Sequence, residues 1–182
     1  MAQQVWYMKN TVNQYGIQVS ISDMEYGFTS QGGAQVVLDA VDVVHASTFF
    51  YSSNCGLAQR FSDVLPFFDQ DATYGSNAWG SVEGSAKWFR DHTSWSKKVI
   101  FTQTGWPTNT NVWPPNNPAA QASYDSSKAY LDLLDAHCED FKNLHGGIGW
   151  FWQIWNDAML DGWGALDWNN NPKFQFSPRT DC

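Results

Sequence analysis

The chain has few positive charges. Its 182 residues include 10 lysines and arginines against 18 aspartates and glutamates, so its formal net charge is -8 at pH 7. Because the sequence has no basic run that would neutralise phosphates, we expect no nucleic acid among its partners. It also lacks an apolar run long enough to cross a bilayer, so we expect no membrane partner. Residues 1–6 lack the basic start and apolar run of a signal peptide.

Metal-ligand and cofactor motifs are missing as well. The 4 histidines are scattered and show no ligand spacing with the cysteines: His45, His92, His137 and His145. The sequence also has no phosphate-cradling glycine loop, no CxxC pair and no Ser-His-Asp motif. We therefore expect no metal and no cofactor.

Cysteine is scarce, which limits covalent cross-linking. The 3 cysteines, Cys55, Cys138 and Cys182, allow at most one internal disulfide. Cys138 lies late in a predicted helix and Cys182 is the last residue of the chain. The disulfide candidate is therefore Cys138 with Cys182, which would hold the C-terminal tail in an oxidising compartment.

Aromatic residues, in contrast, are abundant. The chain has 11 Trp, 7 Tyr and 12 Phe residues, and several of them fall at predicted strand ends rather than inside apolar runs. Most aromatic side chains fill a core. Aromatic faces with polar neighbours also suit sugars, whose C–H faces stack on rings while their hydroxyls need donors and acceptors.

Hydrophobic periodicity alternates between helix and strand along the chain. The pattern predicts helices over 2–15, 33–41, 78–92 and 119–141, and strands over 17–22, 43–47, 99–103 and 148–153. This order indicates a single domain over 1–182 in the α/β class, with four parallel strands alternating with helices. In such folds, ligands bind beyond the carboxyl ends of the strands.

The strand at 99–103 carries the most informative motif. A β-branched and aromatic run ends at Gln103 and is followed at once by Gly105 and Pro107, which is typical of a buried strand that ends in a sharp turn. Gln103 is the last polar side chain of this strand. We expect it to project into the cleft beyond the strand end.

The motif resembles a known family signature. Residues 100–107, Ile-Phe-Thr-Gln-Thr-Gly-Trp-Pro, are similar to the strand-seven pattern Ile-x-Glu-Thr-Gly-Trp-Pro of glycoside hydrolase family 17, the fungal and plant β-1,3-glucanases and glucanosyltransferases. The closing segments 162–167 and 171–174 also resemble that family. The resemblance implies a partial TIM barrel, a half-barrel that corresponds to strands five to eight. The chain is short for a complete barrel of about 250 residues.

The resemblance also implies that no catalytic residue is intact. Gln103 stands at the position of the family's nucleophilic Glu, and an amide cannot form the covalent intermediate of a retaining glycosidase. The Glu that acts as general acid/base belongs to the missing N-terminal half. Gln153 and Asn156 also replace acids of the family pattern. Three amides in place of carboxylates favour binding of a neutral sugar over its cleavage.

The remaining substrate-binding candidates follow from position. Asp23, Glu25 and Tyr26 come just after the first strand, where the family's subsite residues lie, although Asp23 is equally suited to cap the following turn. Trp106 and Trp155 are the predicted stacking residues, because each stands within three residues of a site amide.

The resemblance further indicates a loop insertion at about 48–63 and a secreted or cell-wall location. A half-barrel would expose unpaired backbone on its outer strands. We therefore expect either a homodimer or a complementary half-barrel as partner.

Three functions remain open at this stage. The first is a catalytically impaired protein that binds a β-1,3-glucan oligosaccharide or polysaccharide. The second is an active hydrolase or transglycosylase that uses Asp23, Glu25 or Asp157, or a complementing half-barrel. The third is a structural or signalling protein that retains only the scaffold.

Overall fold

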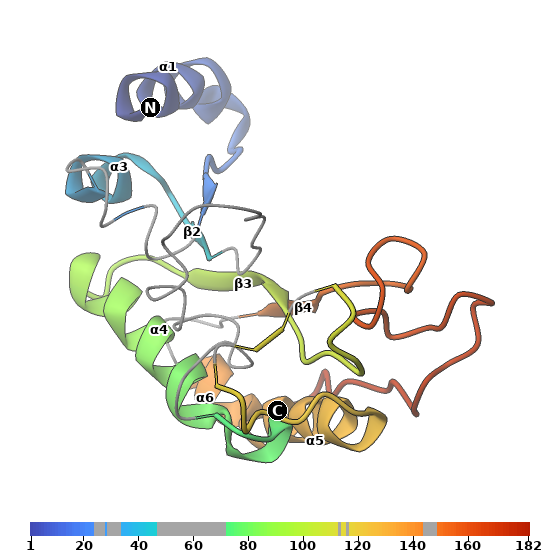
Figure 1. Cartoon of the computed structure of the whole chain (residues 1–182). Helices are drawn as coiled ribbons and strands as arrows, with labels where there is room; N and C mark the ends of the chain where they lie inside the picture. The colour runs from blue at the N-terminus through green and yellow to red at the C-terminus, as the bar shows by residue number, and fades with distance from the viewer. Residues whose placement is uncertain (24–27, 29–33, 47–71, 113, 116, 144–148) are drawn as a thin grey trace.

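The computed structural model describes residues 1–23, 28, 34–46, 72–112, 114–115, 117–143 and 149–182 (Figure 1). The predicted insertion at 48–63 lies outside the described residues. The elements follow one another as α1 (Ala2–Val12), η1 (Asn13–Tyr15), β1 (Ser22–Asp23), α3 (Ala34–Ala40), β2 (Val44–Ala46), η3 (Gly75–Asn77), α4 (Trp79–His92), β3 (Val99–Thr104), α5 (Tyr124–Ala136), α6 (Cys138–Asn143) and β4 (Trp150–Trp152).

The strands form one parallel sheet in the order β1-β2-β3-β4. Ser22 is paired with His45, and His45 in turn with Ile100, so the three residues lie in one row across the sheet. Figure 1 shows α1 and α3 beside β1 and β2, and α4, α5 and α6 beside β3 and β4. The prediction of an α/β fold with parallel strands and intervening helices is therefore confirmed.

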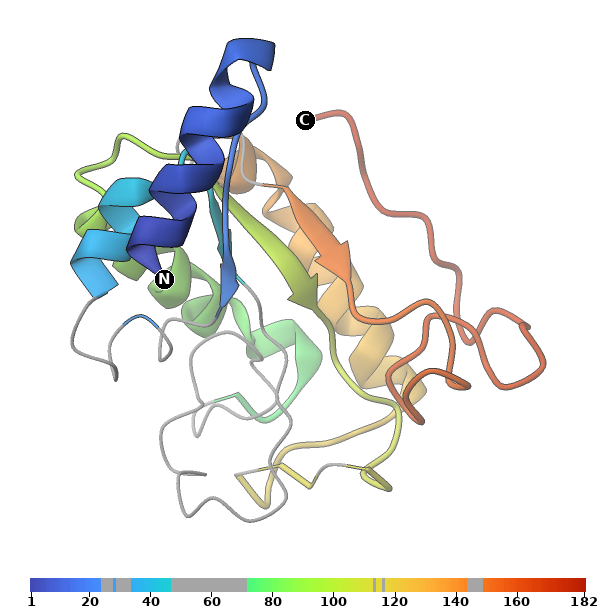
Figure 2. The same ribbon diagram turned by 90° about the horizontal axis from the view of Figure 1, so that it is seen from above.

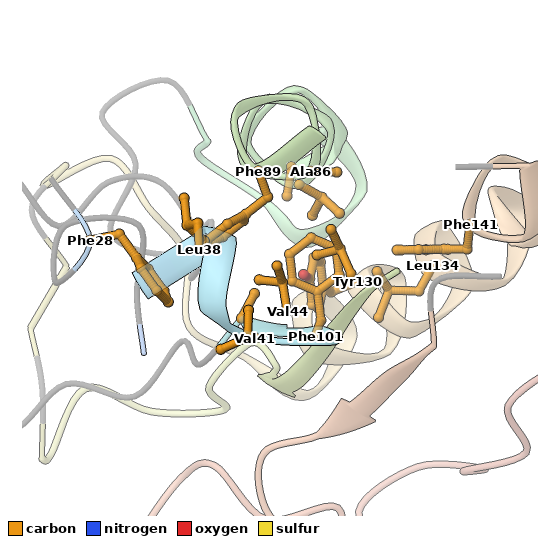
Figure 3. Packing of buried hydrophobic residues seen from close by; sticks show 14 of the residues in the cluster. Phe28, Leu38, Val41, Val44, Ala86, Phe89, Phe101, Tyr130, Leu134 and Phe141 are labelled. Atoms are coloured by element: carbon orange, nitrogen blue, oxygen red, sulfur yellow. The ribbon is translucent and has the colours of Figure 1, made fainter. Parts of the chain in front are cut away.

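The core lies between the sheet and the helices (Figure 3). Val99 and Phe101 are buried on β3, while Ile100 between them and Thr102 after them are only half-buried. The helices contribute buried residues from α3, α4, α5 and α6: Leu38, Ala86, Phe89, Tyr130, Leu134 and Phe141. The apolar face predicted for 78–92 is confirmed at Val82, Ala86 and Phe89.

The first predicted strand has different boundaries in the structure. The sequence pattern places it at 17–22, but pairing with β2 begins only at Ser22. Upstream, the backbone N–H of Val19 donates to the carboxylate of Asp42 at 2.8 Å, and the N–H of Asp42 donates to the carbonyl of Val19 at 2.8 Å. The Asp42 side chain, rather than a backbone carbonyl, accepts the N–H of Val19, so residues before Ser22 do not form regular strand pairing.

The helix predicted over 119–141 is in fact two helices. The α5 helix starts at Tyr124, because the hydroxyl of Ser123 accepts the N–H of Ser126 and caps its first turn. It ends before His137, whose ring stacks on Trp79 with centroids 3.6 Å apart. The prediction missed both boundaries because each depends on a side-chain contact rather than on apolar periodicity.

The C-terminal tail returns to the helices. Cys138 at the start of α6 and Cys182 form a disulfide, with their Cα atoms 5.7 Å apart. Phe174 and Phe176 pack edge-on against Trp152 of β4, with centroids 6.0 and 5.6 Å away. Among the described residues, no helix combines the length and the hydropathy that a bilayer crossing requires.

Candidate functional site

The side chain of Gln103 is positioned by an irregularity in β3. The residue pairs Phe101 with Trp150 and Thr104 with Trp152 show that β3 has one more residue than β4 over the same stretch. Phe101 and Thr104 are both buried on the helix side, where the Thr104 hydroxyl lies 2.6 Å from the Tyr130 hydroxyl. The two residues between these buried positions, Thr102 and Gln103, are both half-buried.

Gln153 lies at the same edge of the sheet as Gln103. Its backbone N–H donates to the carbonyl of Thr104 at 2.6 Å. A Cβ atom on Gly105 would stand only 2.5 Å from the carbonyl oxygen of Gln153, so only glycine permits this close approach. Figure 2 shows the loops that follow β3 and β4 leaving the sheet on the same side.

Two amides at this edge have polar atoms without internal partners. The Gln153 side chain is 6% exposed, and within the described part of the chain its Nε2 atom has no hydrogen-bond partner. Asn156 donates through Nδ2 to Asn170 at 2.7 Å, while its Oδ1 atom is buried without a partner among the described residues. A buried polar atom that lacks a partner costs free energy until water or a ligand satisfies it.

The two predicted stacking residues differ in exposure. Trp106 is 0% exposed, its Nε1 donates to the carbonyl of Gln121 at 2.9 Å, and its ring lies near Tyr130. The prediction that Trp106 stacks on a ligand is therefore wrong, because this ring belongs to the core. Trp155 is 63% exposed and has a free ring surface on the loop after β4.

The loops after β3 and β4, residues 105–112 and 153–172, contain three carboxylates, and each of them stabilises a loop. Asp157 is buried, accepts the N–H of Gly164 at 2.8 Å and forms an ion pair with Lys173 at 2.6 Å. Asp161 accepts hydrogen bonds from Asn111 and Trp168, which lower its pKa. Asp167 caps the turn over 167–171, and bonds from Asn171 lower its pKa too.

Three predicted site residues stand at or just after the end of β1 in the sequence. Asp23 is the last residue of β1, at the carboxyl end of the strand. Glu25 and Tyr26 lie outside the described residues. Within the described residues, no group of three or more histidine, cysteine, aspartate or glutamate side chains would hold a metal ion.

The described site is thus a hydrogen-bonding edge flanked by the carboxylates of Asp161 and Asp167. Amides of Gln103, Gln153 and Asn156 offer donors and acceptors, and Trp155 offers an exposed ring. Sequence reasoning missed Trp168 and Asp161, although a tryptophan inside the polar run Asp167-Trp168-Asn169-Asn170-Asn171 was a signal for an exposed ring.

No protein-family model matches the chain, and no curated protein matches its sequence. Solved structures do match its fold. A glycoside hydrolase family 17 β-1,3-glucanosyltransferase from Rhizomucor miehei aligns at 18% identity with a TM-score of 0.64, over 94% of this chain and 54% of that one. An active-site mutant of the Rhizomucor miehei enzyme in complex with laminaritriose aligns at 16% identity with a TM-score of 0.65, over 100% and 57%.

An endo-laminarinase from Formosa Hel1_33_131 aligns at 12% identity with a TM-score of 0.51, over 91% of this chain and 48% of that one. The chain therefore has the fold of part of a family 17 glycoside hydrolase, an arrangement consistent with a partial TIM barrel. It spans roughly half the length of the structures that it matches.

Proposed function

We propose that the protein binds β-1,3-glucan oligosaccharides or polysaccharides and is catalytically impaired. The observation that carries this proposal is the extra residue in β3, which leaves Gln103 half-buried between the buried Phe101 and Thr104 and supports an amide that faces the carboxyl edge of the sheet. By its motif, Gln103 occupies the nucleophile position. An amide there can donate to and accept from a sugar hydroxyl, but it cannot form a glycosyl-enzyme bond.

The surrounding residues support binding rather than cleavage. The three carboxylates of the two loops are engaged in an ion pair or in loop hydrogen bonds, which favours a structural role for them over a catalytic one. Trp155, whose ring is exposed, would stack on a pyranose ring. The Nε2 atom of Gln153 and the Oδ1 atom of Asn156 are buried without partners among the described residues, so these side chains would have to turn outward to bond a glucan hydroxyl. Asp23, Glu25 and Tyr26 complete the proposed subsites.

The test is the affinity for laminaritriose of two variants, Gln103→Ala and Trp155→Ala. We expect each to weaken binding by about fivefold, since loss of one hydrogen-bonding or stacking group costs about 1 kcal/mol. Trp95→Ala is the matched control, because Trp95 is also exposed but precedes β3 at the opposite end of the strand. Equal affinities in all three variants would contradict this site.

We also propose that the sheet forms a half-barrel domain over 1–182, completed by another half-barrel. Phe151 of the outer strand β4 is 62% exposed, and the matching structures contain roughly twice the length of this chain. A second copy would give a homodimer, and a separate N-terminal half is the other form of partner. The molar mass of Phe151→Glu against that of the wild type, by light scattering, tests association through this strand.

A secreted or cell-wall location completes the proposal. The disulfide between Cys138 and Cys182 supports it, because such bonds persist in oxidising compartments. The location of the full-length native protein in fractionated cells would test it.

A further inference from the structure

A second exposed tryptophan stands beyond the proposed site. Trp168 is 60% exposed, yet its ring is fixed at one edge, because Nε1 donates to Oδ1 of Asp161 at 3.1 Å. A ring already held in one orientation loses little entropy when a ligand stacks on it.

Asp161 is itself held from the neighbouring loop. Its Oδ2 accepts Nδ2 of Asn111 at 3.0 Å, which joins the loop after β3 to the loop after β4. The same two loops are joined again where the carbonyl of Gly162 accepts the N–H of Thr108 at 2.7 Å. The Asp161 carboxylate and the Asn111 amide therefore lie near the Trp168 indole Nε1, on two loops that two hydrogen bonds hold together.

The turn that carries Trp168 is also rigid. Oδ1 of Asp167 accepts the N–H groups of Asn169 and Asn171, both at 2.8 Å, and thus caps the turn on either side of the ring. The backbone links the turn to the proposed site, because the N–H of Leu166 donates to the carbonyl of Trp155 at 3.0 Å. Trp155 and Trp168 belong to one loop cluster beyond the carboxyl end of β4.

We propose that Trp168, Asp161 and Asn111 form an outer subsite for a longer glucan chain. The ring of Trp168 stacks on the apolar face of a pyranose, and Asp161 and Asn111 bond the hydroxyls of the same sugar. This inference rests on the proposed function. It adds that affinity rises with the length of the glucan, since a longer oligosaccharide contacts Trp168 as well as Gln103 and Trp155.

The experiment compares laminaritriose with laminarihexaose by titration calorimetry. We expect Trp168→Ala to weaken hexaose binding about three- to tenfold and to leave triose binding within twofold of the wild type. Trp168→Phe retains a ring but lacks Nε1 and therefore the bond to Asp161, so it is expected to recover only part of the loss. Trp95→Ala is the control, and thermal unfolding of each variant establishes that it is folded.

The outcomes separate the two proposals. If the wild type binds both sugars and Trp168→Ala binds hexaose equally well, the outer subsite is overturned while the proposed function stands. An equal loss for both sugars would also overturn it, because Trp168 would then belong to the central site. If the wild type binds neither sugar, the proposed function fails and takes the outer subsite with it.

Discussion

The carbonyl oxygen of Gln153 occupies space that any side chain on Gly105 would need. A Cβ atom built on Gly105 stands 2.5 Å from that oxygen, and the N–H of Gln153 is bonded to the carbonyl of Thr104 just before it. The backbones of β3 and β4 are thus in direct contact just beyond the ends of the two strands. This contact sets the positions of Gln103 and Gln153 relative to each other.

Gly105→Ala should therefore damage both stability and binding. The obstacle is backbone rather than a flexible side chain, so β3 and β4 must separate, and we expect a loss of about 2 kcal/mol or more in the free energy of unfolding. Urea unfolding followed by tryptophan fluorescence measures it. The control is Gly84→Ala within α4, where a Cβ meets nothing within 4 Å and should stabilise by about 0.5–1 kcal/mol. Equal stabilities of the two variants would refute the close contact.

Replacement of Lys173 should be strongly destabilising. Its side chain is only 1% exposed and donates to Asp157 at 2.6 Å and Thr108 at 2.8 Å. Lys173→Met leaves the Asp157 carboxylate buried without its cation, at a cost of about 3–5 kcal/mol in the free energy of unfolding. Adding Asp157→Asn removes the unpaired charge and should restore a large part of that loss.

The matched control for the buried Lys173–Asp157 ion pair is an exposed ion pair on α4. Lys87 and Asp91 in α4 lie 2.6 Å apart with exposed side chains, so Lys87→Met should change stability by no more than about 0.5 kcal/mol. Chemical unfolding of the four proteins compares them. A Lys173→Met variant as stable as Lys87→Met would show that the buried ion pair has no structural role.

Asp42 should make stability depend on acidic pH. Burial raises the pKa of Asp42. Hydrogen bonds from Lys9 and Val19 and the charges of Lys9 and Lys97 lower it by more than burial raises it, so the net pKa lies below the ordinary value. A carboxylate with a lowered pKa contributes stability above its unfolded pKa of about 3.9, and this contribution is lost as the pH falls through the folded pKa.

The measurement is the free energy of unfolding of wild type and Asp42→Asn at pH 7, 5 and 3. We expect the wild type to be more stable by about 1 kcal/mol at pH 7 and 5, and this difference to shrink below pH 4. A difference that stays constant down to pH 3 would contradict the stabilising role of the ionised carboxylate.

Periodicity was sufficient to predict much of the fold. The buried face of α4 and the end of β3 at a Gly-Trp-Pro turn follow from local sequence. The alternation of helices and strands, which implies parallel strands, follows from it as well. These features depend on contacts near in the chain or on burial of one face. The resemblance carried by the Gln103 motif agrees with the fold of the matching structures.

The details of the site depend on contacts between distant residues. Trp106 was predicted to stack on a ligand, but a carbonyl fifteen residues away, that of Gln121, accepts its Nε1 and allows the ring to be buried. The anchor of Trp168 on Asp161 arises only where two loops meet. The extra residue of β3 becomes visible only once β4 is aligned beside it.

The central claim is that this edge binds a neutral glucan without cleaving it. Laminaritriose is titrated into the wild type and Gln103→Glu, tryptophan fluorescence is followed, and samples are assayed for released sugar. We predict a saturable fluorescence change in the wild type and no fast release of sugar from either protein. Sugar release at about 1 per second or more would contradict the account, since this is the range of ordinary enzyme turnover. Absence of any saturable signal would contradict glucan binding itself.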